Sequence, residues 1–106
     1  MCRIIYGCIN MDGEILSGSN GEDPALDFFV EKTEGSFEIS YKTPFNKIPS
    51  LTFTPNYGKS IPTHSNFERR LGNLILVSNE LKRFKLRLVL ENNAIEPQDF
   101  SFIAIK

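Results

Sequence analysis

The sequence predicts an all-β fold, an antiparallel β-sandwich of about seven or eight strands with no substantial helix. Stretches of alternating apolar and polar side chains recur about every ten residues between turn residues, a spacing typical of sandwiches rather than of β-α-β units. The clearest of these stretches closes the sequence at residues 99–105. No segment has helical periodicity long enough to organise the fold. We therefore expect residues 1–106 to form a single sandwich domain.

Turn residues mark the strands of the first half. Asp-Gly at 12–13 and Glu-Gly at 34–35 are typical of tight turns between antiparallel strands. Residues 17–24 form a loop rich in Ser, Gly, Asn and Asp. The expected strands of this half span residues 3–9, 14–17, 27–33 and 36–42.

In the second half, prolines and a long segment without strand patterning separate the strands. Pro44 and Pro49 bracket a connection that cannot lie in a central ladder, because proline lacks the N–H donor. Residues 56–73 are the longest segment without strand patterning, and we expect a long loop or insertion there. The expected strands of this half span residues 51–55, 74–78, 84–90 and 99–105.

The closing strand predicts assembly as well as fold. Phe100, Phe102 and Ala104 fall on one face, which we expect to fill the interior of the sandwich. Ile103 and Ile105 fall on the other face, so both faces are apolar at the end of the strand. Such a strand is expected to dock in a sheet that is covered, at least in part, on both sides. We expect Ile103 and Ile105 to face a neighbouring subunit.

Composition excludes several classes of protein. With 41% hydrophobic and 24% charged residues, the chain is typical of a globular protein and not of a disordered one. No apolar run approaches the roughly 20 residues that span a bilayer, so we expect no membrane insertion. The start of the sequence lacks a secretory signal, and Cys2 and Cys8 lie too far apart in an extended strand to pair. We therefore expect a cytoplasmic protein.

Charge is distributed unevenly along the sequence. Residues 1–38 carry eight acids and two bases, whereas residues 39–106 carry ten bases and five acids. In one interpretation each half solvates its own surface. In the other, an acidic face of one copy meets a basic face of another, which would produce an oligomer.

The residues of catalysis and metal binding are sparse. His64 is the single histidine, no nucleophile-elbow pattern accompanies it, and a solvated loop histidine is the simpler interpretation. Cys2 and Cys8 do not have zinc-ligand spacing, and no glycine-rich phosphate loop occurs between a strand and a helix. We therefore expect no enzymatic activity, no metal and no cofactor.

Candidate ligand-binding residues lie in the long loop and around a basic strand. Their bases suit phosphates or acidic sugars, but a pI near 5.8 argues against a dedicated nucleic-acid binder. An outward strand face or a lysine-protected edge would also explain the basic strand. The candidates are Tyr57, His64, Arg69, Arg70, Lys82, Arg83, Lys85 and Arg87.

Several short motifs follow one another along the chain: Asp12-Gly13, Ile15-Leu16-Ser17-Gly18-Ser19, Phe29-Val30, Gly35-Ser36-Phe37-Glu38-Ile39, Pro44-Phe45, Pro49, Thr54-Pro55 and Asp99-Phe100-Ser101-Phe102-Ile103-Ala104-Ile105. In this order, and above all in the last motif, the chain resembles a group of small all-β domains of bacteria and phages. These domains are free-standing or belong to tail-fibre-type proteins. The resemblance covers most of the chain outside about residues 56–73. The group in turn resembles the H-type lectin sandwich, which implies assembly as trimers or hexamers, sugar binding and, for a phage protein, a place in the virion.

The leading hypothesis is a non-enzymatic β-sandwich that self-associates, as a trimer, and presents loops to a glycan or protein ligand. Adjacent apolar residues such as Ile4-Ile5 and Phe28-Phe29, and the run 74–77, indicate that both faces of several strands are covered. The alternative hypothesis is a nucleotide or nucleic-acid binder that uses the basic strand face.

Overall fold

The computed structural model describes residues 2–21, 25–57, 72–90 and 96–106, and that part of the chain contains eight strands and no helix. Four strands form one antiparallel sheet, sheet A: β1 (Ile4–Asn10), β2 (Ile15–Gly18), β5 (Ser50–Asn56) and β8 (Asp99–Ile105). The other four form sheet B: β3 (Phe28–Thr33), β4 (Ser36–Tyr41), β6 (Asn73–Asn79) and β7 (Arg83–Val89).

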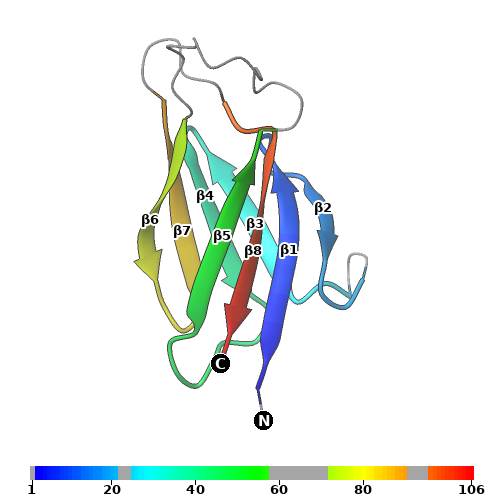
Figure 1. The fold of residues 1–106 in the computed structure, drawn as a ribbon. Helices are drawn as coiled ribbons and strands as arrows, with labels where there is room; N and C mark the ends of the chain where they lie inside the picture. Colours follow the sequence, from blue (N-terminus) through cyan, green and yellow to red (C-terminus); the bar gives the residue numbers. More distant parts are fainter. Residues whose placement is uncertain (1, 22–24, 58–71, 91–95) are drawn as a thin grey trace.

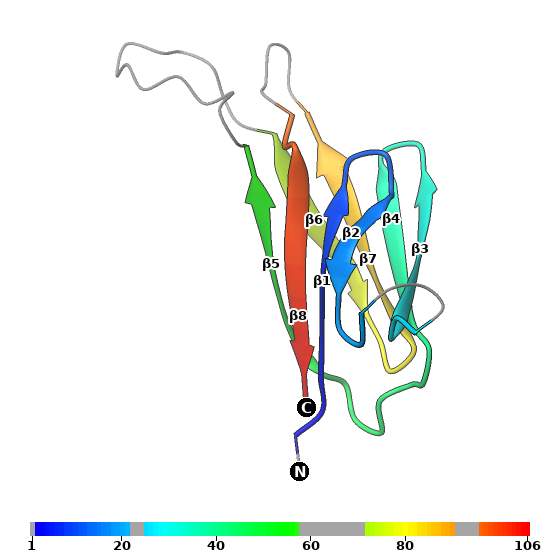
Figure 2. The same cartoon turned by 90° about the vertical axis from the view of Figure 1, so that its right-hand side faces the viewer.

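The two sheets pack face to face (Figure 1). The strand order is β2-β1-β8-β5 in sheet A and β3-β4-β7-β6 in sheet B. In Figure 2, β5 and β8 lie on the left and β4 and β3 on the right. The predicted antiparallel sandwich of seven or eight strands is confirmed.

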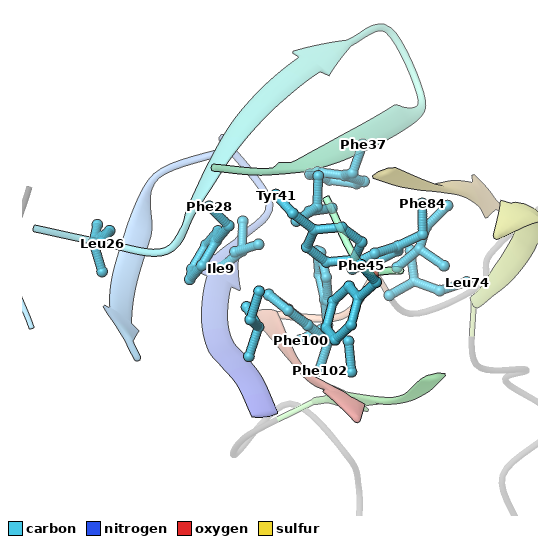
Figure 3. Packing of buried hydrophobic residues seen from close by; sticks show 14 residues of the cluster. Ile9, Leu26, Phe28, Phe37, Tyr41, Phe45, Leu74, Phe84, Phe100 and Phe102 are labelled. Carbon is cyan, nitrogen blue, oxygen red and sulfur yellow. The ribbon is translucent and has the colours of Figure 1, made fainter. Parts of the chain in front are cut away.

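The core consists of the inward-facing side chains of both sheets, with aromatic rings at its centre (Figure 3). Phe102 of sheet A meets Phe28 and Phe84 of sheet B edge to face, with a centroid separation of 5.0 Å in both pairs. Phe37 and Phe100 form a third such pair across the sheets at 5.3 Å. These edge-to-face contacts join the sheets because the positive edge of one ring lies against the negative face of the other.

Two glycines make room for the Phe28 ring. A Cβ atom added to Gly7 on β1 would lie 2.4 Å from Phe28 Cζ, and one added to Gly18 on β2 would lie 2.6 Å from Phe28 Cε1. Gly7 and Gly18 are cross-strand partners, so two adjacent residues without side chains lie beneath the Phe28 ring. The close approach of β3 to sheet A therefore depends on glycine at both positions.

The tight turns lie where the sequence predicts them. Gly13 adopts a φ of +87° between β1 and β2, and Gly35 a φ of +72° between β3 and β4. Both values favour glycine, because side chains disfavour the left-handed region. The side-chain oxygen of Asn10 accepts the N–H groups of Asp12 and Glu14, each at 2.9 Å, which closes the first turn.

The closing strand β8 lies between β1 and β5 in the middle of sheet A, which confirms that it is docked. Phe100, Phe102 and Ala104 are at most 1% exposed and fill the interior as predicted. Ile103 and Ile105 point outward and remain 48% and 36% exposed. The cover expected on the second face is therefore not supplied by the described residues of this chain.

Candidate interaction surfaces

The outer face of sheet A carries four exposed apolar side chains that form two cross-strand pairs. Ile4 is the register partner of Ile105, and Tyr6 is the partner of Ile103. Ile4 and Tyr6 are each 50% exposed. We call Ile4, Tyr6, Ile103 and Ile105 the apolar patch.

Small polar side chains surround the apolar patch. Thr52 is the partner of Ile103 on β5, and farther along the sheet Ser101 lies between Cys8 and Thr54. Ser50 and Ser17 extend this rim on the edge strands. The outer face carries no charged side chain among these rows, and the first one met along β8 is Asp99, at one end of the sheet. Depletion of charge around apolar residues is the composition that distinguishes the centre of protein interfaces.

Cys8 lies on the same face with its thiol in the neutral form. Burial, reinforced by the negative charge of Asp99 and a hydrogen bond to it, raises the pKa of the Cys8 thiol. Both Cys8, which is half-buried, and the exposed Cys2 are free thiols. Because the thiolate is the reactive form, Cys8 is poorly suited to nucleophilic chemistry at neutral pH.

The outer face of sheet B is charged. Arg83, Lys85 and Arg87 alternate outward along β7, which is a central strand between β4 and β6. Of the two explanations for the basic strand, the outward face is therefore correct and the edge is not. Lys82 precedes the strand, in the connection from β6, and its carbonyl accepts the N–H of Tyr41.

Acidic side chains lie near these bases on the strands β4 and β3. Glu38 of β4 is the register partner of both Lys85 and Glu31, and Arg83 Nη1 lies 3.1 Å from Glu38 Oε1. The acidic and basic halves of the sequence thus meet within one chain on this face. An exposed ion pair contributes about 1 kcal/mol or less to stability, but neighbouring acids weaken the attraction of the surface for phosphates.

Of the remaining sequence-predicted site residues, Tyr57 is the one that lies within the described part of the chain. Tyr57 is buried just after β5, and its hydroxyl donates to the carbonyl of Gly72, so it joins the chain on either side of residues 58–71. His64, Arg69 and Arg70 lie outside the described residues, as does most of the expected loop.

Two concave regions lie among the described residues. A groove of about 870 Å³ separates the edge strands β2 and β3, and Leu16 and Phe29 are more than half exposed at its rim. Its lining among the described residues includes no charged side chain. A smaller pocket of about 440 Å³ at one end of the molecule is lined by Arg3, Lys47 and Lys106, among others. The sequence pattern did not identify it, because its residues come from three distant segments.

In the part of the chain that the structure describes, no helix is long and apolar enough to cross a membrane. The same residues contain no group of three His, Cys, Asp or Glu side chains placed to hold a metal ion. Comparison of the chain with protein-family models, curated proteins and solved structures found no match.

Proposed function

We propose that this protein is a non-enzymatic interaction module that self-associates through the outer face of sheet A. The observation that carries the proposal is the contrast between the two outer faces. Sheet A presents the apolar patch within a rim of small polar side chains. On sheet B the exposed apolar side chains, such as Ile75 and Val89, share the outer face with the charges of Glu38, Arg83, Lys85 and Arg87. An exposed apolar patch within a polar rim marks an interaction site, and a second copy is the occupant that supplies the same uncharged face.

The energy available from the patch is of the same order as the cost of association. Its side chains are 36% to 50% exposed. Covering the exposed half of four large side chains contributes roughly 3–6 kcal/mol per copy, since complete burial contributes about 1.5–3 kcal/mol each. Two copies together gain roughly twice this amount, against an association cost of about 4–15 kcal/mol.

The size of the outer face of sheet A determines how much of it a stable interface must bury. Three strands of sheet A have seven residues and β2 has four. At about 4.8 Å between strands and about 3.3 Å per residue, the outer face measures at most roughly 20 by 23 Å. A stable interface buries about 800 Å² per partner. The Ser and Thr rim must therefore be covered together with the apolar patch, and their hydroxyls can bond to each other or to trapped water.

The sheet edges are less suited to assembly than the face. Edge strand β5 contains Pro55, and edge strand β3 carries the charges of Glu31 and Lys32. The β1–β2 and β6–β7 pairings each contain a register shift next to an edge strand. Proline, charge and bulges all discourage edge-to-edge pairing, so packing of faces is the more favourable mode.

A trimer is the assembly that the resemblance to lectin-type sandwiches implies. In a closed oligomer, equivalent loops are repeated around the axis, and this repetition raises the avidity for a repeated ligand such as a glycan. The alternative of a nucleotide or nucleic-acid binder is weaker, because Glu38 and Glu31 interrupt the basic surface on sheet B.

The test is the molar mass of matched variants in solution. Tyr6→Thr with Ile103→Thr removes the centre of the apolar patch while keeping side chains that suit strands. Ile75→Thr with Val89→Thr is the control, since both side chains are exposed on the outer face of sheet B. Circular dichroism first establishes that both variants are folded.

We expect light scattering at about 50 μM to show an oligomer for the wild type and the control, and a monomer for the sheet A variant. The proposal is overturned if the sheet A variant keeps the wild-type mass. It is equally overturned if the control dissociates instead.

A further inference from the structure

The pocket at the end of the sandwich is built from three segments that the backbone holds together. Arg3 and Lys106 exchange backbone hydrogen bonds, at 2.7 Å for the Arg3 N–H and 3.0 Å for the Lys106 N–H. The connection between β4 and β5 supplies the other wall, and the N–H of Phe45 anchors it to the carbonyl of Leu81 at 2.9 Å. Figure 1 shows both chain ends beside this connection. We call this cavity the end pocket.

The guanidinium of Arg3 is held in place on the wall of the end pocket. Its Cζ atom lies 4.4 Å from the centroid of the Phe45 ring, and its Nη1 donates to the carbonyl of Pro44 at 3.1 Å. Phe45 is itself 4% exposed and packs edge to face on Tyr41 at 4.9 Å. Stacking and the carbonyl fix the plane of the guanidinium but use only part of its five N–H donors.

The charged side chains that line the end pocket among the described residues are all positive. Arg3, Lys47 and Lys106 line it, and its other polar side chains are Thr43 and Asn46. No acidic side chain is among the lining residues, and the Arg3 guanidinium has no carboxylate partner among the described residues. This differs from the basic face of β7, where Glu38 lies within 3.1 Å of Arg83. The cations of the end pocket are thus left for a ligand.

We propose that the end pocket binds a small organic oxyanion, a molecule of the size of an acidic monosaccharide or a sugar phosphate. A fixed guanidinium suits an oxyanion because two parallel N–H donors match two oxygens, and the lysines add point charges. The volume of about 440 Å³ falls within the range of small-molecule sites, so the ligand has a body besides its charged group. Thr43 and Asn46 offer hydrogen bonds to the hydroxyls of such a body. This binding does not depend on self-association.

The experiment is a titration of the ¹⁵N-labelled protein followed by NMR. The probes are glucuronate for a carboxylate, glucose 6-phosphate for a phosphate and glucose as the neutral control. We expect the oxyanions to shift the amide resonances of Arg3, of residues 43–47 and of Lys106, with dissociation constants that rise with salt. The stronger of the two oxyanions identifies the charged group that the pocket prefers.

Variants separate the end pocket from general surface charge. Arg3→Gln is expected to weaken binding about tenfold or more, because hydrogen bonds between charged groups are the strong ones. Since this change also removes a packing contact, the variant Lys47→Gln with Lys106→Gln provides a second measurement, and it too is expected to weaken binding. Lys85→Gln on sheet B is the matched control and is expected to bind like the wild type.

The proposal is overturned if neither oxyanion shifts these resonances, or if glucose shifts them equally. It is also overturned if the double lysine variant binds as tightly as the wild type, or if Lys85→Gln weakens binding to the same extent. A sheet A variant that keeps the wild-type mass would overturn the proposed self-association but not the end pocket, and absent oxyanion binding would overturn the end pocket but not self-association.

Discussion

The substitution Gly7→Ala tests how closely the two sheets are packed. The added Cβ would lie 2.4 Å and 2.9 Å from two atoms of the Phe28 ring and 3.0 Å from Phe102 Cε1. Carbon atoms in favourable contact lie about 3.5–4.0 Å apart, so the nearest contact is too short by more than about 1 Å. Phe28 cannot move away easily, because it is 1% exposed and packs on Phe102 at 5.0 Å.

We expect Gly7→Ala to lower the free energy of unfolding by about 1–3 kcal/mol, the usual cost of overpacking a core. Without the clash, the same change would stabilise the protein by about 0.4–1 kcal/mol, since alanine restricts the unfolded chain. For a domain of this size, the loss corresponds to a fall in Tm of roughly 4–13 °C.

The assay is urea unfolding followed by circular dichroism, at one protein concentration for all variants because self-association also contributes to stability. Phe28→Leu is the companion variant, since it removes the ring that the new methyl group would strike. In a double-mutant cycle, Gly7→Ala should cost at least about 1 kcal/mol less in the Phe28→Leu background. An unchanged or raised stability of Gly7→Ala would refute the packing described for β1 and β3.

Two further predictions concern buried polar groups. The Tyr41 hydroxyl is buried without a hydrogen-bond partner among the described residues. Tyr41→Phe should therefore raise the free energy of unfolding by about 1 kcal/mol in the same assay. A fall of about 1 kcal/mol would instead show that the hydroxyl has a hydrogen-bond partner. Burial raises the pKa of Tyr41 to about 12, above the value of about 10 in the unfolded chain. The free energy of unfolding should therefore be unaffected by this group below about pH 10 and should fall as the pH rises towards about 12. Tyr41→Phe should lack this fall. Burial and Asp99 raise the pKa of the Cys8 thiol, whereas Cys2 is exposed. At about pH 7.5, Cys8 should therefore react with iodoacetamide about tenfold more slowly than Cys2, as followed by mass spectrometry. Equal rates in the folded protein would contradict the placement of Cys8.

Local patterns in the sequence were sufficient for the strands and their faces. Alternation alone placed Phe100 and Phe102 inside and Ile103 outside, because successive side chains of a strand point to opposite faces. The turns at Gly13 and Gly35 followed from residue types that tolerate positive φ. The same local rule placed Lys85 and Arg87 together on one face of a strand.

Strand order and register are non-local, and the sequence pattern did not contain them. The pairing of β1 with β8 brings Ile4 and Tyr6 beside Ile103 and Ile105, although nearly the whole chain separates them. The pairing of β4 with β7 likewise places Glu38 beside the basic residues. The end pocket joins Arg3, residues 43–47 and Lys106 for the same reason.

The run of apolar residues at 74–77, which predicts cover on both faces, is covered only in part by the described residues. Leu74 is 8% exposed, but Ile75 and Val77 are 49% and 54% exposed on β6. This strand is at the edge of sheet B, and a register shift between Leu76 and Ser78 interrupts its alternation. Consecutive apolar residues in this run therefore do not have both faces covered within the described chain.

The central claim is that an uncharged face of sheet A brings copies of this chain together. The most direct test is the molar mass of the wild-type protein by light scattering, from about 1 to 100 μM, in low salt and in about 1 M NaCl. We expect a multiple of 12.1 kDa that persists in high salt, because hydrophobic contact is not screened. A mass of 12.1 kDa at every concentration, or an oligomer that dissociates as salt is added, would contradict the claim.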